Sequence, residues 1–330
     1  MGGPVTDETA RALRRAWFDY LDTVEPVRSK LHAYCLKLTG SVFDAEDLVQ
    51  EALLRGFGAI GRGDFFNRGS PAVQNARAYL GRIATNLWLD AQRRAGREPL
   101  DPDADRPVAA AGEAIITNAA GAALFAIPPQ ERAAVVLKDV FDFSLAEIAS
   151  ILSTTEGAVK AALHRGRGKL ASGRGAATPL RGAAASPELI DRFLAAFNAR
   201  DAAAIAAVLS ETVIYEARGV GGEIGEGAIW IEANAARPPG VAWERHRFEG
   251  EEIAVGVLVR EGRRKMLLGV SRLEEAGGLI SRHVGYFFAP ETLSLVAAAL
   301  DMAAADHGYH QDPSTLERMI ADASLAWRGL

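Results

Sequence analysis

The stretch between Glu156 and Glu188 has the clearest chemistry in this sequence. It contains no Asp or Glu, but it contains six cations: Lys160, Arg165, Arg167, Lys169, Arg174 and Arg181. A run of cations without acids suits a polyanion, because each Lys or Arg that meets a phosphate releases a bound counterion. The stretch therefore predicts a surface that binds the phosphate backbone of a nucleic acid.

The preceding residues contain the elements that would position these cations. Residues 144–152 have apolar residues at helical spacing, and Ser153 or Thr154 is placed to cap a second helix. One face of that second helix would be buried, with these residues: Val159, Leu163, Gly166 and Leu170. Residues 127–170 therefore predict a helix-turn-helix whose last helix has a basic outer face. The alternative is an ordinary helical hairpin with a solvated charged surface.

The composition supports a protein of several domains. A length of 330 residues predicts two or three domains. The formal net charge of −5 hides an uneven distribution. Residues 128–185 have eight Lys/Arg and five Asp/Glu, whereas residues 186–330 have 14 and 21. A single cysteine, Cys35, and the lack of a long apolar run predict a cytoplasmic protein with no membrane partner.

Two stretches rich in proline and small residues divide the chain into three blocks. They are residues 96–112, which are acidic, and residues 172–187. The resulting domain boundaries are 1–95, a linker over 96–118, 119–174, a second linker over 175–186, and 187–330.

The first block is expected to be entirely helical. A helix through Leu31–Leu38 would end at Gly40, and a helix would run from Ala76 to Arg94. Between them, Asp44 is predicted to cap a helix. The buried stripe of that middle helix would consist of Leu48, Val49, Leu53 and Leu54.

The last block changes from helical to alternating periodicity. Residues 187–207 predict helix, and five later segments predict strands: 213–215, 243–248, 253–259, 266–273 and 279–287. A closing helix is expected over Thr292–Ala305. Helices followed by a run of strands joined by hairpins favour an α+β domain with an antiparallel sheet.

Three blocks of residues resemble the bacterial RNA polymerase sigma factors, in particular the extracytoplasmic-function (ECF) group. They are LHAYCLKLTGSVFDAEDLVQEALLRGF, ARAYLGRIATNLWLDAQRRAGRE and the helix-turn-helix segment IPPQERAAVVLKDVFDFSLAEIASILSTTEGAVKAALHRGRGKL. The resemblance covers residues 10–172, about half the chain. It implies a helical bundle (1–95) that contacts core polymerase and the −10 promoter element. The helix-turn-helix domain (119–174) would contact the −35 element.

The resemblance assigns a docking role to the second helix of the bundle. Contacts to the clamp helices of the polymerase β′ subunit are implied for Asp44, Glu46, Asp47, Gln50 and Glu51. Carboxylates on an exposed helical face suit arginines of a partner. Asp44 and Asp47 could also serve to cap the helix and favour its dipole.

The same resemblance implies two sets of DNA contacts. The −10 set is Phe65, Asn67, Arg68, Arg82, Asn86, Asp90, Arg93 and Arg94. The −35 set is Thr154, Thr155, Glu156, Lys160, His164, Arg165, Arg167 and Lys169. Aromatic walls and cations would trap unstacked bases, although helical spacing favours core packing for Trp88 and Tyr79. The loop with Phe65 is longer and richer in glycine than the family pattern. The acidic linker either threads a nucleic-acid channel or serves as a solvated tether.

Residues 187–305 resemble the SnoaL-like, ketosteroid-isomerase-like cone fold. Its characteristic opening matches FLAAFNARDAAAIAAVLSETVIYEA, which implies a helix, an Asp-containing turn, a second helix and then the first strand. The expected fold class is therefore multidomain: two all-α sigma domains followed by an α+β cone domain. Polar candidates for a site in the cone are Tyr215, Glu216, Glu223, His246, Arg282, His283 and Tyr286. Their spacing assigns no acid, base or oxyanion role, so no catalytic residue, metal site or cofactor is predicted. A glycine-rich motif implicated in regulation in such families has only a divergent counterpart at Gly219–Gly227.

The leading interpretation is an ECF-type sigma factor regulated by its C-terminal domain. Its partners would be core RNA polymerase (the β′ clamp helices and the β flap), promoter DNA and a small ligand in the cone. Two other interpretations remain open: a ligand-sensing helix-turn-helix regulator that works without core polymerase, and an isomerase-like enzyme fused to a DNA-binding module.

Overall fold

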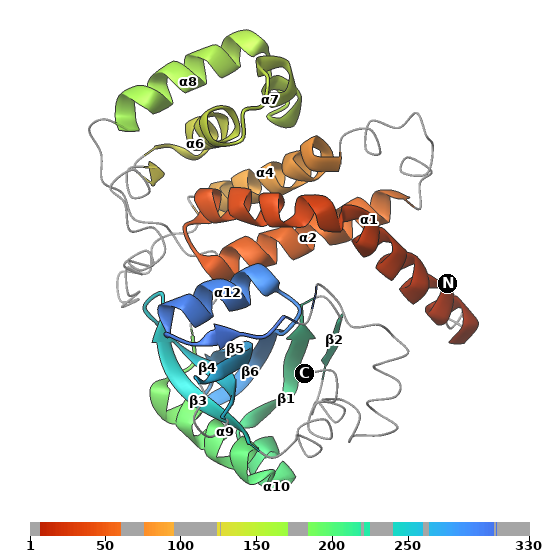
Figure 1. Ribbon diagram of the computed structural model, residues 1–330, viewed down its shortest axis with the longest axis vertical. Helices are drawn as coiled ribbons and strands as arrows, with labels where there is room; N and C mark the ends of the chain where they lie inside the picture. The colour runs from red at the N-terminus through yellow and green to blue at the C-terminus, as the bar shows by residue number, and fades with distance from the viewer. Residues whose placement is uncertain are drawn as a thin grey trace. The chain divides into compact units, whose positions relative to one another are not determined.

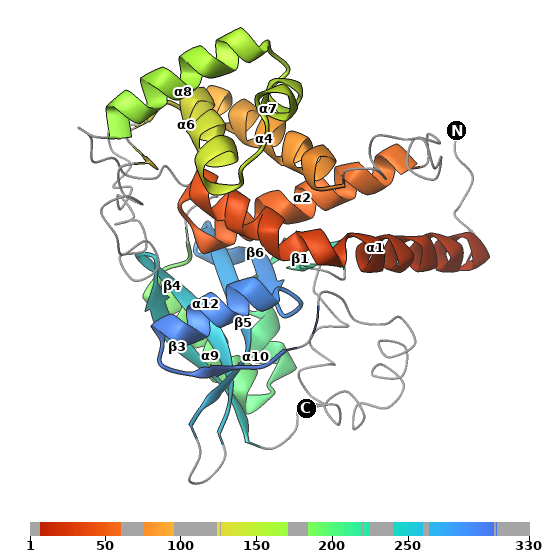
Figure 2. The same cartoon turned by 45° about the horizontal axis from the view of Figure 1, so that its top comes forward.

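The structure, a computed structural model, describes residues 7–60, 76–95, 124–125, 127–170, 184–218, 221–224, 240–259, 264–306 and 308. The chain forms two compact units, and helix α1 crosses the division between them. One unit is Thr23–Arg181, and the other combines Met1–Asp22 with Gly182–Leu330. Figures 1 and 2 show the helical and the sheet-containing parts from two directions.

The helical part contains six α-helices and one π-helical turn among the described residues. They are α1 (Asp7–Thr39), α2 (Val42–Ile60), α4 (Ala76–Ala95), α6 (Pro129–Val135), η1 (Val136–Val140), α7 (Leu145–Ile151) and α8 (Glu156–Leu170). The three helices predicted for the first block are present as α1, α2 and α4. The loop with Phe65, Asn67 and Arg68 and the acidic linker lie outside the described residues.

The corner between α1 and α2 follows the local sequence. Gly40 has a φ of +76°, a conformation that glycine adopts without steric cost and that ends α1. Ser41 then caps α2, because its Oγ accepts a hydrogen bond of 3.3 Å from the backbone N–H of Asp44. The prediction that Asp44 is the cap was wrong by three positions. Leu54, expected in the buried stripe, is 52% exposed.

The helix-turn-helix is built from α7 and α8. Ser144 and Glu147 form a reciprocal capping box at the start of α7. Ser153, with a φ of +52°, turns the chain after α7. The Oγ1 of Thr155 accepts a 3.2 Å hydrogen bond from the N–H of Ala158, so Thr155 caps α8. The sequence had predicted Ser153 or Thr154 for this cap, and both predictions were wrong.

The second unit opens with the predicted pair of helices. Helix α9 (Pro187–Ala199) ends at Arg200, whose φ of +59° reverses the chain. The Oδ1 of Asp201 accepts a 3.0 Å hydrogen bond from the N–H of Ala204 and caps α10 (Ala202–Ala206). The expected helix, Asp-containing turn and second helix are therefore confirmed.

The sheet contains seven strands among the described residues. They are β1 (Leu209–Ala217), β2 (Gly221–Ile224), β3 (Val241–Phe248), β4 (Glu251–Leu258), β5 (Met266–Ala276), β6 (Leu279–Tyr286) and β7 (Ala303–Ala304). Their order is β2-β1-β6-β5-β4-β3, and β7 pairs with β5. The expectation of an antiparallel sheet holds for four of the six pairs. The pairs β1–β6 and β5–β7 are parallel, because long connections return these strands to the sheet.

Helices pack on this sheet and bury its core. One side of α9 and the facing strand residues form one apolar cluster: Leu189, Phe193, Phe197, Val213, Ala254, Leu273 and Ile280. Helix α12 (Pro290–Ala299) packs on β5, and Figure 1 shows it on the side of the sheet opposite α9. The predicted closing helix was too long, since the chain leaves α12 and forms β7 before Ala305. The fold class, helical domains followed by an α+β domain, is confirmed.

Candidate nucleic-acid interface

Helix α8 presents one exposed face along most of its length. Glu156, Lys160 and His164 follow one another at intervals of four residues, and all three are exposed. Thr155 is exposed beside them, whereas Thr154 is half-buried. The face can enter a groove, because its other exposed positions, Gly157, Ala158 and Ala161, add little bulk.

The opposite face of α8 packs closely on α6. Val159, Leu163 and Gly166 are buried, as predicted, whereas Leu170, the fourth residue predicted for this face, is half-buried. A Cβ at Gly166 would lie 2.7 Å from Cγ2 of Val135 and 3.3 Å from the carbonyl oxygen of Glu131. Glycine at this position therefore lets the two helices approach until the backbone of α6 touches α8.

The basic end of α8 is paired with carboxylates of the preceding elements. Arg165 Nε donates to Glu131 Oε1 at 2.7 Å, and Lys169 Nζ donates to Glu131 Oε2 at 2.8 Å. Arg167 Nε donates to Asp139 Oδ2 at 2.9 Å, and its Nη2 also contacts this carboxylate. The sequence showed an excess of cations after Glu156. It did not show that these three would meet carboxylates 28 to 38 residues earlier.

The pKa shifts of Glu131 and Arg167 agree with the pairing. Burial by itself raises the pKa of Glu131, but the hydrogen bonds from Lys169 and Arg165 outweigh it and lower the pKa below the ordinary value. The hydrogen bond to Asp139 raises the pKa of Arg167. Glu131 is therefore a carboxylate and Arg167 a guanidinium cation at neutral pH.

Helix α4 presents a second polar face. Arg82, Asn86, Asp90 and Arg93 are exposed and lie at i, i+4, i+8 and i+11. Arg93 Nη1 donates to Asp90 Oδ1 at 2.6 Å. Arg94 is exposed as well, so the five predicted −10 residues of α4 lie on the surface of one helix.

A buried arginine lies against the inner face of α4. Arg132 is 5.3 Å from the ring centroid of Trp88 and donates to the carbonyl oxygens of Leu38, Phe125 and Ile127 at 2.8, 3.2 and 3.3 Å. Burial lowers its pKa to about 10. Trp88 is fully buried, so its predicted role in the core is confirmed.

A second arginine connects α4 with the segment after η1. Arg77 Nη2 donates to the carbonyl oxygen of Phe141 at 2.6 Å, and its guanidinium lies 4.3 Å from the ring centroid of Phe143. Tyr34 meets the ring of Phe141 edge-on at 5.6 Å. A shallow depression between these side chains is also lined by Lys30, Leu31, Gly81 and Leu137. These contacts lie within the unit Thr23–Arg181 and join its two halves.

The predicted docking face on α2 is only partly exposed. Glu46 is fully buried, and its Oε1 accepts hydrogen bonds from Arg28 at 2.5 Å and from Gln50 at 2.8 Å. The expectation that Glu46 is exposed was wrong, because Arg28 of α1 packs over it. Asp44 and Gln50 are also buried, and Asp47 is half-buried. Glu51 is exposed and accepts a 2.7 Å hydrogen bond from Arg55.

A buried polar pair lies in the interior of the sheet domain. His283 Nε2 lies 2.8 Å from Ser271 Oγ, and the imidazole meets the rings of Tyr215 and Phe193 edge-on at 4.9 and 5.8 Å. Burial lowers the pKa of His283 to about 3, so the ring is neutral at physiological pH. Ser271 was not among the sequence candidates. It pairs with Gly285, two residues along β6 from His283, so its approach to the imidazole appears only once β5 and β6 are paired.

Glycines in the strands make room for aromatic rings in this interior. A Cβ at Gly269 or Gly285 would lie 2.4 or 2.5 Å from the ring of Phe287, and a Cβ at Gly256 would lie 3.0 Å from that of Trp243. The two rings therefore lie close against the backbone of these strands. They occupy space that side chains at these positions would otherwise fill.

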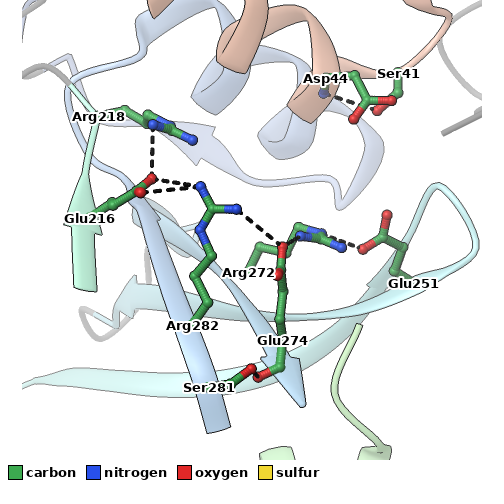
Figure 3. A network of polar contacts seen from close by, with 9 residues as sticks. All are labelled: Ser41, Asp44, Glu216, Arg218, Glu251, Arg272, Glu274, Ser281 and Arg282. Atoms are coloured by element: carbon green, nitrogen blue, oxygen red, sulfur yellow. Dashed lines mark hydrogen bonds and ion pairs between the residues drawn. The ribbon is translucent and has the colours of Figure 1, made fainter. Parts of the chain in front are cut away.

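The remaining polar candidates of the sheet lie elsewhere. Glu216 and Arg282 neighbour Tyr215 and His283 in sequence, so their side chains point to the opposite face. There a chain of ion pairs crosses four strands (Figure 3): Arg218, Glu216, Arg282, Glu274, Arg272 and Glu251. His246 lies 3.2 Å from Glu244, and Tyr286 is fully buried. Nothing is described for the side chain of Glu223.

Among the described residues, no group of three or more His, Cys, Asp or Glu side chains is arranged to hold a metal ion. No helix in the described ranges combines the length and apolar character needed to cross a membrane.

Family models match the two helical segments. The model for Sigma-70 region 2 matches residues 23–98, and the model for Sigma-70, region 4 matches residues 118–170. The first match contains α2 and α4, and the second contains α6, α7 and α8.

Curated relatives carry the same family name. The ECF RNA polymerase sigma factor SigG of Mycobacterium tuberculosis is 32% identical over 232 residues, which is 60% of this chain and 61% of SigG. The chain thus spans about three fifths of the length of that relative. ECF RNA polymerase sigma factor SigW of Bacillus subtilis is 31% identical over 165 residues, 45% of this chain and 84% of SigW.

Two solved structures are among those that this chain matches. The crystal structure of the extracytoplasmic function sigma factor SigJ of Mycobacterium tuberculosis matches 83% of this chain and 98% of that chain, with 22% identity and a TM-score of 0.32. A putative ketosteroid isomerase from Kribbella flavida matches 30% of this chain and 75% of that chain, with 23% identity and a TM-score of 0.25.

The identity to SigW extends over most of that protein, and both helical segments match their family models in the expected order. This chain therefore belongs to the ECF RNA polymerase sigma factors.

Proposed function

We propose that this chain binds core RNA polymerase and directs it to promoters that have both a −10 and a −35 element. The exposed polar face of α8, with Glu156, Lys160 and His164 at intervals of one helical turn, supports this proposal most strongly. In a helix-turn-helix, the N-terminal residues of the second helix meet base edges in the major groove. A protein with this role works in the cytoplasm.

Each predicted surface has a separate task in this proposal. The face of α4 with Arg82, Asn86 and Arg93 would contact the opened −10 strand, where cations hold the backbone while bases are trapped. Glu51 and Asp47 of α2 would meet arginines of the β′ clamp helices. Lys160 would contact phosphate, and Thr155, Glu156 and His164 would lie near base edges.

For the C-terminal sheet domain we propose regulation rather than catalysis. His283 is held neutral in an apolar interior and forms a hydrogen bond with the hydroxyl of Ser271. A general acid or base needs a pKa near the working pH, and a pKa of about 3 is far below it. A small neutral ligand that binds beside the rings of Tyr215 and Phe193 could signal through this domain.

Run-off transcription with purified core polymerase tests the main proposal. The full chain should support initiation from a subset of fragments in a promoter library, whereas core polymerase alone should not. Glu51→Lys should weaken binding to core polymerase, and the matched control Glu211→Lys, at an exposed position of β1, should not. Sequence-specific DNA binding without any polymerase-dependent transcript would instead favour the regulator that acts alone.

The regulatory role has its own test. A chain that ends at Arg181 is compared with the full chain in the same run-off assay, after circular dichroism has verified that its helices form. Altered promoter output at equal helix content would support regulation. Equal output from both chains would argue against a regulatory role of the sheet domain.

A further inference from the structure

The basic residues of α8 fall into two groups according to their partners. Lys160 and His164, nearer the start of the helix, have no hydrogen bond or ion pair within the part of the chain that the structure describes. In the second half, Arg165, Arg167 and Lys169 all meet carboxylates that belong to α6 or η1. A DNA phosphate that binds the second group must therefore displace a carboxylate, whereas one that binds the first group displaces none of the described side chains.

The carboxylates are held firmly in place. The side chain of Glu131 is only 10% exposed, and its two oxygens are divided between Arg165 and Lys169. The approach of α6 to α8 at Gly166 fixes this position, because the backbone oxygen of Glu131 itself borders the glycine. Asp139 takes both Nε and Nη2 of Arg167, the same fork that a phosphate would use.

The cations nevertheless stay within reach of solvent. The side chains of Arg165, Arg167 and Lys169 are 56%, 51% and 46% exposed. Exposed ion pairs are weak, and a phosphate can compete with the carboxylates for each cation. The pairing therefore adjusts the affinity for phosphate without blocking it.

We propose that Glu131 and Asp139 compete with DNA phosphates for the basic end of α8 and so lower the affinity of this chain for DNA of arbitrary sequence. The inference rests on the DNA-binding role proposed above. Sequence-independent binding comes almost entirely from phosphate contacts, so it depends most on the number of available cations. In a specific complex, the first half of α8 fixes the orientation by base contacts, and the basic end lies farther from the groove. The two carboxylates would thus act as specificity-determining residues.

Asp139→Asn tests the proposal in the full chain. It makes the fork of Arg167 available without changing the size of the side chain. Affinity for a duplex of arbitrary sequence, followed by fluorescence anisotropy, should rise roughly two- to fivefold at low salt. The slope of log K against log salt should become steeper by about 0.9, the value for one added phosphate contact. Retention on immobilised heparin should shift to higher salt in parallel.

Asp142→Asn is the matched control. It removes the same charge three residues away, from a carboxylate that is 94% exposed and paired with Lys138 rather than with α8. Its affinity and salt slope should change less than those of Asp139→Asn. In the Asp139→Asn background, Arg167→Gln should remove the whole gain. Equal changes in the two Asp variants, or no change in Asp139→Asn, would overturn the proposal.

Glu131→Gln provides a second variant, which makes two cations available and retains an acceptor. Its salt slope should steepen by about twice 0.9, measured only after thermal unfolding has verified the fold. This readout needs no polymerase, so its outcome is independent of the run-off assay. If transcription fails while the slopes change as expected, the proposed function fails and the carboxylate mechanism stands. If transcription succeeds while the slopes do not change, the carboxylate mechanism fails and the proposed function stands.

Discussion

Arginine–carboxylate pairs occur in both units of this protein, but in different surroundings. On α8 the cations are about half exposed, and each partner comes from a different helix of the same small domain. On the sheet face, Arg272 is 2% exposed and pairs with Glu251 and Glu274 at 2.7 and 2.5 Å. Glu216, Arg282 and Glu274 extend that chain across neighbouring strands (Figure 3).

The difference shows which charges are available to a partner. A half-exposed pair contributes little to stability and can exchange one partner for another at low cost. A buried guanidinium between two carboxylates cannot exchange its partners, because the loss of one partner would leave a buried charge without water or a counterion. The charges of α8 are therefore suited to binding, and those around Arg272 are suited to fixing strand register.

The largest effect is expected for Arg272→Ala. Removing the guanidinium leaves Glu251 and Glu274 close together on the sheet, and the cost should be about 3–5 kcal/mol of unfolding free energy. Arg264→Ala is the control, because its side chain is 56% exposed and pairs with Asp301 at the surface. That loss should be about 0–1 kcal/mol. Urea unfolding measures both variants, and comparable losses would contradict the distinction between buried and exposed pairs.

A second test uses the neutral His283. Its folded pKa of about 3 lies below the ordinary value, so the unfolded chain binds a proton that the folded chain refuses. This contribution to stability is complete above about pH 6.5 and is lost as the pH falls, by roughly 1.4 kcal/mol per unit. Urea midpoints at pH 7.5 and pH 5.0 should therefore differ. In His283→Gln the difference should shrink, and an unchanged difference would assign it to other groups.

The packing beneath the α8 ion pairs gives a third, smaller effect. Gly166→Ala should destabilise by about 1–2 kcal/mol, because the new methyl group meets Val135 and the backbone of Glu131. Gly168→Ala is the matched control on the same helix, since a Cβ there meets nothing within 4 Å. It should stabilise by up to about 1 kcal/mol through helix propensity. If both variants gain stability, α6 and α8 can move apart at Gly166 at little cost in free energy.

Local sequence patterns predicted most of the elements around these sites. The buried stripe of α8, the turn at Asp201 between two helices and the end of α1 at Gly40 each depend on a few neighbouring residues. These signals are local, so they do not depend on which distant segments pack against the element. The helix-turn-helix could therefore be recognised from the sequence alone.

Long-range contacts could not be predicted in the same way. Glu46 was expected on the surface because a helical wheel cannot show that Arg28 of another helix lies over it. The pairing of Glu131 with Arg165 and Lys169 joins residues 34 and 38 positions apart. The charge count from the sequence treated these cations as available to DNA. The packing of α6 on α8 shows that they are paired with carboxylates.

The smallest predicted effect compares two lysines of α8 directly. Lys160→Gln removes a cation that has no ion pair among the described residues, so binding should weaken on all sequences and the salt slope should flatten by about 0.9. Lys169→Gln removes a cation already paired with Glu131, so its slope should flatten by less. Both changes cost one positive charge on one helix, and any difference must come from the carboxylate. Equal slopes would mean that the exposed pair dissociates freely in solution. The charge count from the sequence would then describe the binding surface better than the ion pairs of the structure do.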